Sequence, residues 1–375
     1  MNTARRKFFR DLTTASLATG ALSHWPRLSL MAAEQPSGLI RLDRNENPYG
    51  PDQEAIAAIG KSARLVNRYS ASERQALRKT IAKLHGVDAQ QIILASGSSD
   101  IFRSAVRLAR DTKGKLIVAS PTFDVASREA RRAGLPIEAV PLTREYSHDL
   151  EKMLSLAHGS SGLVYICNPN NPTGSLTPRN HLEAFLNELP PTFTGLIDEA
   201  YHHYVPDTPA YVSFIDRPVS NKNVIVTRTF SKICGLAGER IGYAVSSPHI
   251  AGNLPAEELE SSVSVSSVVA ARAILEDDQF IRRCYRLNDD DRQEFLNQIN
   301  ARHGHAVDPH ANFVFMHAGR PAREVVDYFE TKGILIGPPF PEMNTHVRVS
   351  LGLADEMKAF WSVWDSLIPA GMMHT

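Results

Sequence analysis

Short apolar runs alternate with helical segments between residues 91 and 245, and this alternation constrains the fold more than any other feature. The expected strands cover residues 91–95, 115–119, 162–166, 195–197, 224–227 and 242–245. Continuous apolar strands separated by helices are typical of a mostly parallel sheet covered on both faces, which is an α/β fold. No GxGxxG motif opens a helix after the first strand, so a dinucleotide-binding Rossmann domain is not indicated.

The pattern changes beyond about residue 250. A long charged amphipathic helix is expected over 277–300, and short strands over 313–316, 334–336 and 347–349. We therefore expect two domains after the N-terminal segment. The predicted boundaries are 34–60 for an N-terminal arm and the start of the small domain, 61–250 for the large domain, and 251–375 for the rest of the small α+β domain.

Residues 1–33 have the features of an export signal. Arg5 and Arg6 precede a mildly apolar stretch over 12–22, and small residues follow around Ala32. Paired arginines before such a stretch resemble the bacterial twin-arginine signal. The sequence thus predicts a periplasmic or otherwise exported protein, the alternative being a basic amphipathic tail on a cytoplasmic one. The apolar run is too short to cross a membrane, so no stable membrane insertion is expected.

Charge and cysteine content exclude several other classes. Lys plus Arg and Asp plus Glu number 41 each, so net charge gives no reason to expect nucleic acid as a partner. The three cysteines form no CxxC pair, and the histidines lack partners at ligand spacing. We expect neither a disulfide framework nor a metal site.

The segment from Thr229 to Lys232, which follows a buried strand, places two hydroxyls beside a lysine, and Arg240 comes eight residues later. A lysine whose amine pKa is lowered forms an imine with an aldehyde. The hydroxyls of Thr229 and Ser231 and the guanidinium of Arg240 could bind one phosphate. By itself the segment fits a surface lysine in a glycine-rich turn equally well.

Three more segments follow strands of the expected sheet. Asn168–Gly174 is a rigid turn that places an asparagine amide at a strand end, where α/β proteins bind ligands. Asp198, in Asp-Glu-Ala-Tyr, could hold a proton on a pyridine nitrogen, and Tyr201 could meet a ring hydroxyl. Ser96–Asp100 opens a helix with small hydroxyl side chains, which suits a phosphate. The last two segments could also be simple helix caps.

Together these segments resemble the fold-type I aminotransferases of class I and II, and most closely the histidinol-phosphate aminotransferase group. The resemblance extends from Asn45-Glu46-Asn47-Pro48-Tyr49-Gly50 to Arg348-Val349-Ser350-Leu351-Gly352. It implies a pyridoxal 5'-phosphate (PLP) enzyme that moves an amino group from an amino acid to a 2-oxo acid. It also implies a large domain with a mostly parallel sheet, a smaller α+β domain and a homodimer.

The resemblance also implies residue roles. Lys232 resembles the Schiff-base lysine and proton shuttle, and Asp198 the partner of the pyridine nitrogen. Asn171 and Tyr201 resemble the residues that bond the ring oxygen, and Phe123 the aromatic that stacks on the ring. The remaining implied cofactor contacts are Gly97, Ser98, Ser99, Thr229, Ser231 and Arg240, with Tyr69 reaching the phosphate in the neighbouring subunit. Ser98-Ser99 departs from the pair usual in the family.

Arg348 resembles the arginine that grips the anionic end of the substrate, and Asn47 and Tyr49 are implied to lie near the substrate. The histidinol-phosphate enzymes resemble one another in a second arginine, which would stand where this chain has Gly337-Pro338-Pro339. Without that cation we expect an amino acid with a free α-carboxylate rather than a phosphorylated substrate. Two alternatives remain: a PLP-dependent decarboxylase or oxidase of the same fold, and a non-catalytic exported binding protein.

Overall fold

The structure is a computed structural model and describes residues 38–219, 221 and 223–367. The predicted export signal, residues 1–33, lies outside these residues. The strands are β1 (Ile40–Leu42), β2 (Ile92–Ala95), β3 (Lys115–Ser120), β4 (Ile137–Pro141), β5 (Gly162–Cys167), β6 (Phe193–Asp198), β7 (Val224–Thr229), β8 (Gly242–Ser246), β9 (Phe313–His317), β10 (Ile334–Ile336) and β11 (His346–Ser350).

The α-helices are α2 (Gln53–Ser62), α3 (Ala71–His85), α4 (Ser98–Asp111), α5 (Val125–Ala133), α6 (Leu150–Ala157), α7 (Arg179–Glu188), α8 (Pro248–Asn253), α9 (Ala256–Ser261), α10 (Val265–Glu276), α11 (Asp278–Ala301), α12 (Ala322–Thr331) and α13 (Ala354–Leu367). Short 3-10 turns are η1 (Ala89–Gln91), η2 (His202–Tyr204) and η3 (Pro341–Met343).

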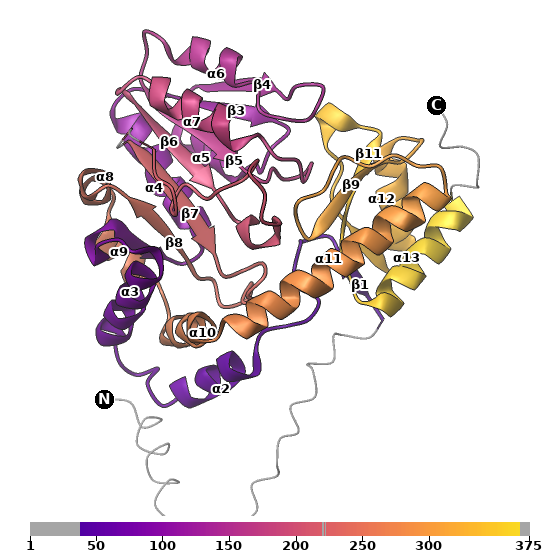
Figure 1. The fold of residues 1–375 in the computed structure, drawn as a ribbon, viewed down its shortest axis with the longest axis horizontal. Coiled ribbons are helices and arrows are strands. Elements are labelled where there is room, and N and C mark those ends of the chain that lie inside the picture. Colours follow the sequence, from indigo (N-terminus) through magenta and orange to yellow (C-terminus); the bar gives the residue numbers. More distant parts are fainter. Residues whose placement is uncertain (1–37, 220, 222, 368–375) are drawn as a thin grey trace, which may run out of the picture. The chain divides into compact units, whose positions relative to one another are not determined.

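A seven-stranded sheet with the order β2-β8-β7-β6-β5-β3-β4 organises the chain (Figure 1). Its pairs β4/β3, β3/β5, β5/β6 and β6/β7 are parallel, and β8 is antiparallel to both of its neighbours. The prediction of a mostly parallel α/β sheet is therefore confirmed. Because parallel strands end at one edge, the turns after Ser120, Cys167, Asp198 and Thr229 meet there.

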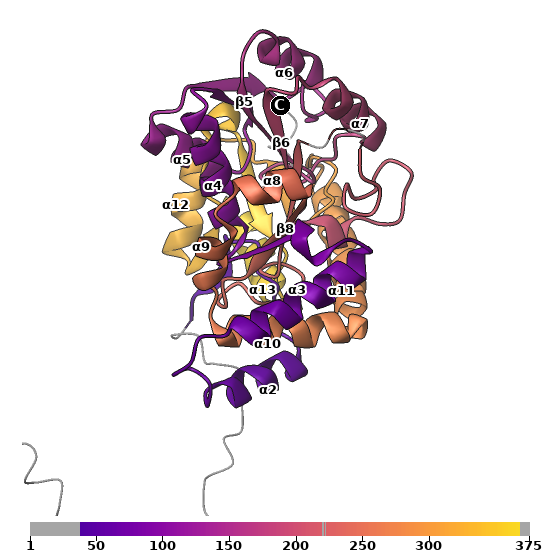
Figure 2. The ribbon, with the colours of Figure 1, turned by 90° about the vertical axis from the view of Figure 1, so that its left-hand side faces the viewer.

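Helices cover both faces of this sheet, as its continuously buried strands require. Along β2, Ile92 and Leu94 pack into one apolar cluster with α3, α6, α7 and α10. Ile93 and Ala95 point the opposite way, into a second cluster with α4, α5, α8 and α9. Figure 2 shows α10 beside α2 and α3, with which it makes extensive contacts.

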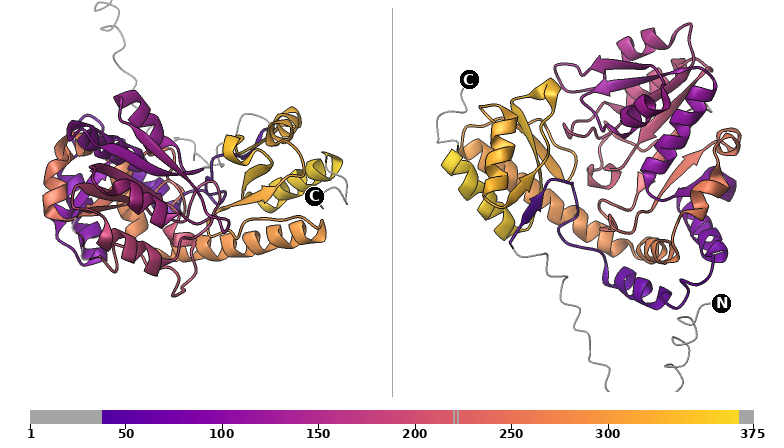
Figure 3. Two further views of the ribbon diagram at one scale, coloured as in Figure 1. Left: turned by 90° about the horizontal axis from the view of Figure 1, so that it is seen from above. Right: turned by 180° about the vertical axis from the view of Figure 1, so that it is seen from behind.

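A third apolar cluster joins the C-terminal half of α11 to β9–β11, α12 and α13, and it includes Leu42 of β1. Strands β9 and β11 pair in an antiparallel manner, with Arg348 opposite Phe315, and β1 pairs in parallel with β10. Figure 3 shows α11 running from the neighbourhood of α10 to this group of elements. The register of β11 fixes where Arg348 stands.

Two strands have no sequence signal of their own. β1 has three residues inside a segment that reads as turns, and β4 carries the exposed residues Ala139 and Pro141 on the edge of the sheet. Within the described residues, no group of three or more His, Cys, Asp or Glu side chains could hold a metal ion. Nor does any helix there combine the length and apolarity that crossing a membrane requires.

Candidate active site

A cavity of about 820 Å³ opens at the carboxyl edge of the parallel strands. It is lined from β5 by Cys167, from β6 by Asp198, from β7 by Thr229 and from β11 by Arg348. Eleven of the sequence-predicted site residues line it together: Ser98, Ser99, Phe123, Asn171, Asp198, Tyr201, Thr229, Ser231, Lys232, Arg240 and Arg348. Ser98 and Arg348, which are 250 residues apart in the sequence, thus line the same cavity.

Asp198 ends β6 and is buried, with 2% of its surface exposed. Its Oδ2 accepts a hydrogen bond of 2.8 Å from the hydroxyl of Tyr165, and its Oδ1 accepts one of 3.1 Å from the amide of Ala200. Burial raises the pKa of this carboxyl to about 6, and the two hydrogen bonds oppose the rise. Nothing in the sequence distinguishes Tyr165 from the apolar residues of the same strand.

Lys232 stands after β7, and its Nζ donates a hydrogen bond of 2.9 Å to the carbonyl oxygen of Arg44. Nζ also lies 5.8 Å from the ring centroid of Tyr201. Burial, and then the positive charge of Arg348, lower the pKa of the Lys232 amine to about 8. A sizeable fraction of the amine is therefore neutral near neutral pH, as nucleophilic attack on an aldehyde requires.

Hydroxyl and guanidinium groups gather at one end of the cavity. The hydroxyls of Thr229 and Ser231 are 2.9 Å apart, and Nη1 of Arg240 lies 3.4 Å from the Ser231 hydroxyl. Ser98 and Ser99 begin α4 and line the same cavity, and the first amides of a helix have no partner within the helix. The set is suited to a phosphate dianion.

Gly97, the predicted cofactor contact just before α4, does not line the cavity, but it lies directly against the guanidinium of Arg240. Its φ of 78° lies in the left-handed region, and a Cβ there would stand 2.5 Å from Nη2 of Arg240. A side chain at this position would displace the guanidinium from the cluster.

Arg348 marks another part of the cavity. Its Nη1 donates to Oδ1 of Asn171 and its Nη2 to the carbonyl oxygen of Asp43, each at 2.5 Å. Its Nε is buried and has no hydrogen-bond partner among the described residues. Asn45, which was not selected from the sequence, donates from Nδ2 to the hydroxyl of Tyr201 at 2.9 Å.

A second cavity of about 490 Å³ adjoins the first, because Phe123, Asn171, Pro338, Pro339 and Arg348 line both. The Pro338-Pro339 turn, where the family resemblance would place a second arginine, is therefore part of the cavity wall. Two other arginines on the wall are exposed and near acids: Arg44 beside Asp43, and Arg323 beside Asp327.

Besides Gly97, three predicted residues do not line the cavity within this chain. Nδ2 of Asn47 donates to the carbonyl oxygen of Ile233 at 2.8 Å, and the Tyr49 hydroxyl donates to Asp291 at 2.5 Å. Asn47 and Tyr49 thus fasten the N-terminal segment, and their predicted contact with substrate is not supported. Tyr69 stands 96% exposed between α2 and α3.

The residues present fit PLP. A buried carboxylate matches a protonated pyridine nitrogen, a lysine with a lowered pKa matches the aldehyde, and the hydroxyl and guanidinium cluster at Gly97 matches the phosphate. The carboxylate, the lysine and the phosphate-binding cluster all lie at the edge of the sheet where the parallel strands end, so the topology of the sheet brings them together.

Comparison with known proteins agrees with this geometry. Residues 37–360 match the family of aminotransferase class I and II. The chain is 32% identical over 329 residues to the histidinol-phosphate aminotransferase of Moorella thermoacetica, covering 86% of this chain and 83% of that protein. Histidinol-phosphate aminotransferase 1 of Thiobacillus denitrificans is 33% identical over 344 residues, or 88% and 86% of the two chains.

Among solved structures, the histidinol-phosphate aminotransferase of Sinorhizobium meliloti in complex with pyridoxal-5'-phosphate superposes with a TM-score of 0.80. The two sequences are 26% identical, and the superposition covers 93% of this chain and 100% of that chain. The predictions of an enzyme and of an aminotransferase fold are confirmed. The chain belongs to the class I and II aminotransferase family.

Proposed function

We propose that this PLP-dependent aminotransferase takes its amino group from an amino acid with a free α-carboxylate and passes it to a 2-oxo acid. The observation that carries the proposal is the meeting of Lys232, Asp198 and Arg348 in one cavity. PLP, when bound, supplies an aldehyde that captures amines and a ring that accepts electrons from the substrate's Cα.

The chain's own residues then have distinct tasks. The carboxylate of Asp198 holds a proton at the pyridine nitrogen. Because Oδ1 of Asn171 accepts from Arg348, its donor is Nδ2, which we assign to the ring oxygen together with the Tyr201 hydroxyl. Phe123 packs on the ring, and Ser98, Ser99, Thr229, Ser231 and Arg240 bind the phosphate. Nζ of Lys232 removes the proton from the substrate's Cα.

Arg348 selects for an anion. Arg348 is 8% exposed and lines the cavity, and a guanidinium binds a carboxylate through two parallel hydrogen bonds. A phosphate monoester carries more charge, and Pro338 offers it no second buried cation. We therefore assign an α-carboxylate to Arg348, with the side chain directed toward the adjoining cavity.

A panel of amino donors with 2-oxoglutarate and pyruvate tests this assignment, with histidinol phosphate included in the panel. We expect stoichiometric exchange between amino acids and oxo acids, and much slower turnover of histidinol phosphate. Preferred turnover of histidinol phosphate would refute the substrate class. Release of carbon dioxide or ammonia without exchange would favour the decarboxylase or oxidase alternative.

We also propose a homodimer in which Tyr69 reaches the phosphate bound in the neighbouring subunit. The support is an exposed apolar loop before α3, in which Leu65 is 41%, Val66 71% and Tyr69 96% exposed. Lys232→Ala and Tyr69→Ala subunits, each inactive alone, should regain activity when mixed and refolded together. A monomer in light scattering would contradict the proposal.

The last proposal concerns location: residues 1–33 direct export of the folded protein. Deleting residues 2–33 should leave activity unchanged and keep the protein in the cytoplasm. Continued export of the shortened chain would exclude the signal.

A further inference from the structure

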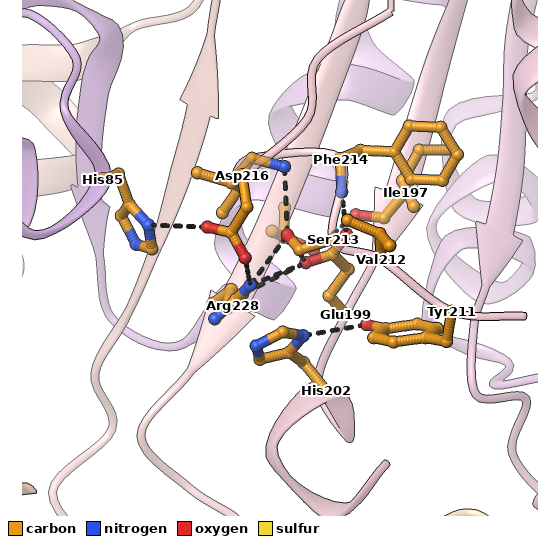
Figure 4. A network of polar contacts seen from close by, with 12 residues as sticks. His85, Ile197, Glu199, His202, Tyr211, Val212, Ser213, Phe214, Asp216 and Arg228 are labelled. Atoms are coloured by element: carbon orange, nitrogen blue, oxygen red, sulfur yellow. Dashed lines mark hydrogen bonds and ion pairs between the residues drawn. The ribbon is translucent and has the colours of Figure 1, made fainter. Parts of the chain in front are cut away.

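A polar network surrounds Glu199, the residue that follows Asp198 of the candidate active site (Figure 4). Glu199 follows Asp198, and the side chains of consecutive residues in an extended chain project to opposite sides. Asp198 therefore faces the cavity, whereas Glu199 faces Arg228 of β7 and the loop that contains Ser213. Glu199 and Ser213 are each 1% exposed and Arg228 is 4% exposed.

The Glu199 carboxylate has a full set of donors. Its Oε2 accepts from the Ser213 hydroxyl at 2.6 Å and from Nε of Arg228 at 3.1 Å, and its Oε1 accepts from the amide of Phe214 at 2.7 Å. Nη2 of Arg228 donates to Ser213 at 2.8 Å and lies 3.9 Å from Asp216. A buried ion pair is seldom a net source of stability. Because every acceptor of this carboxylate is nevertheless paired, the network points to a role in fixing the geometry of the strands.

The pair sits on the two strands that carry cofactor contacts. Glu199 directly follows Asp198, the last residue of β6, and Arg228 precedes Thr229, the last residue of β7. The backbone links the same strands, since the amide of Glu199 donates to the carbonyl oxygen of Thr227 at 3.0 Å. A shift of either side chain would therefore move a contact of the pyridine nitrogen or of the phosphate.

We propose that Glu199 and Arg228 are positioning residues that set the distance between the Asp198 carboxylate and the Thr229 hydroxyl. The proposal rests on the roles assigned above to Asp198 and Thr229. By holding β6 and β7 together on the side away from the cavity, the pair keeps the two ends of the cofactor site in register.

Glu199→Gln tests the proposal, because it keeps the size of the side chain but turns an amide toward Arg228. Arg228→Lys is a milder second variant, which keeps the charge and loses the planar fork. Arg179→Met is a matched control. Arg179 is also buried and holds the same loop through the carbonyl oxygens of Val212 and Arg217, and its side chain makes no hydrogen bond to Glu199 or Arg228.

Three quantities are measured for each variant: the melting temperature, the dissociation constant for PLP, and the pH at which the visible absorbance of the bound cofactor changes. All variants should melt earlier than wild type. Glu199→Gln and Arg228→Lys should also bind PLP at least tenfold more weakly and move the absorbance midpoint by half a pH unit or more. Arg179→Met should stay within twofold and within 0.2 units of wild type, on the order of the error of such titrations.

A merely structural pair would lower only the melting temperature. The proposal is overturned if Glu199→Gln and Arg228→Lys bind PLP as wild type does, or if Arg179→Met changes binding and absorbance as much as they do. Failure of wild type itself to bind PLP through Lys232 would instead refute the proposed function.

Discussion

Replacing Asp198 with Asn should stabilise the cofactor-free protein while it removes most of the turnover. The carboxyl of Asp198 is 2% exposed and its pKa is raised by burial from 3.8 to about 6. A carboxyl whose pKa is higher in the folded state binds its proton more tightly there. Folding therefore loses stability as the pH rises from about 4 to about 6.

The magnitude follows from the shift. The difference of about 2.2 pKa units, at 1.36 kcal/mol per unit, corresponds to about 3 kcal/mol at pH 8. The asparagine avoids this loss, because its Oδ1 can accept from Ala200 and its Nδ2 can donate to the Tyr165 oxygen. The Tyr165 proton then loses its acceptor, which costs about 1 kcal/mol, so a net gain of about 2 kcal/mol is expected.

Urea denaturation of both cofactor-free proteins at pH 4 and pH 8 measures this difference. The stability of Asp198→Asn relative to wild type should increase by about 2.4 kcal/mol between the two pH values, because the unfolded carboxyl is already partly ionised at pH 4. Subtracting wild type removes the contributions of other titrating groups. A difference that is independent of pH would show that Asp198 is not a buried acid with a raised pKa.

Three further predictions concern the other ends of the cavity. Because the Lys232 pKa is lowered to about 8, the rate of PLP capture should rise with pH and level off above about 8 in stopped-flow absorbance; a rise continuing to pH 10 would contradict this. Arg348→Ala should raise the KM for amino acids at least tenfold and change the PLP dissociation constant less than twofold, because Arg348 donates to Asn171 and Asp43 and not to Asp198 or the phosphate cluster. Gly97→Ala should weaken PLP binding about tenfold, because the methyl group displaces Arg240, and should lower stability by about 1–2 kcal/mol in urea denaturation. An unchanged PLP affinity in Gly97→Ala would remove Arg240 from the phosphate site.

The fold could be predicted from the sequence where apolar runs repeat, and the site where several polar residues follow a strand directly. Continuous apolar runs indicate the parallel strands, and their ends coincide with the turns that carry Asn171, Asp198 and Lys232. β1 could not be predicted in this way, because three residues give no period and its pairing partner, β10, lies almost 300 residues later.

The role of an individual side chain depends on which neighbours the fold brings within hydrogen-bonding distance of it. Tyr165 looks like an ordinary core residue until β5 and β6 pair and place its hydroxyl against Asp198. Asn45 and Asn47 belong to the same motif, but Asn45 reaches Tyr201 whereas Asn47 turns to Ile233. The sequence alone does not distinguish these two amides, and for this reason Asn47 was predicted to lie near the substrate and Asn45 was not.

Every role assigned above depends on Lys232 being the amine that captures the cofactor aldehyde. Borohydride reduction of the protein with PLP, followed by peptide mass spectrometry, identifies the lysine that is modified. We expect one added pyridoxyl phosphate group, on Lys232, and none in Lys232→Ala. Attachment to a different lysine, or no attachment, would contradict it.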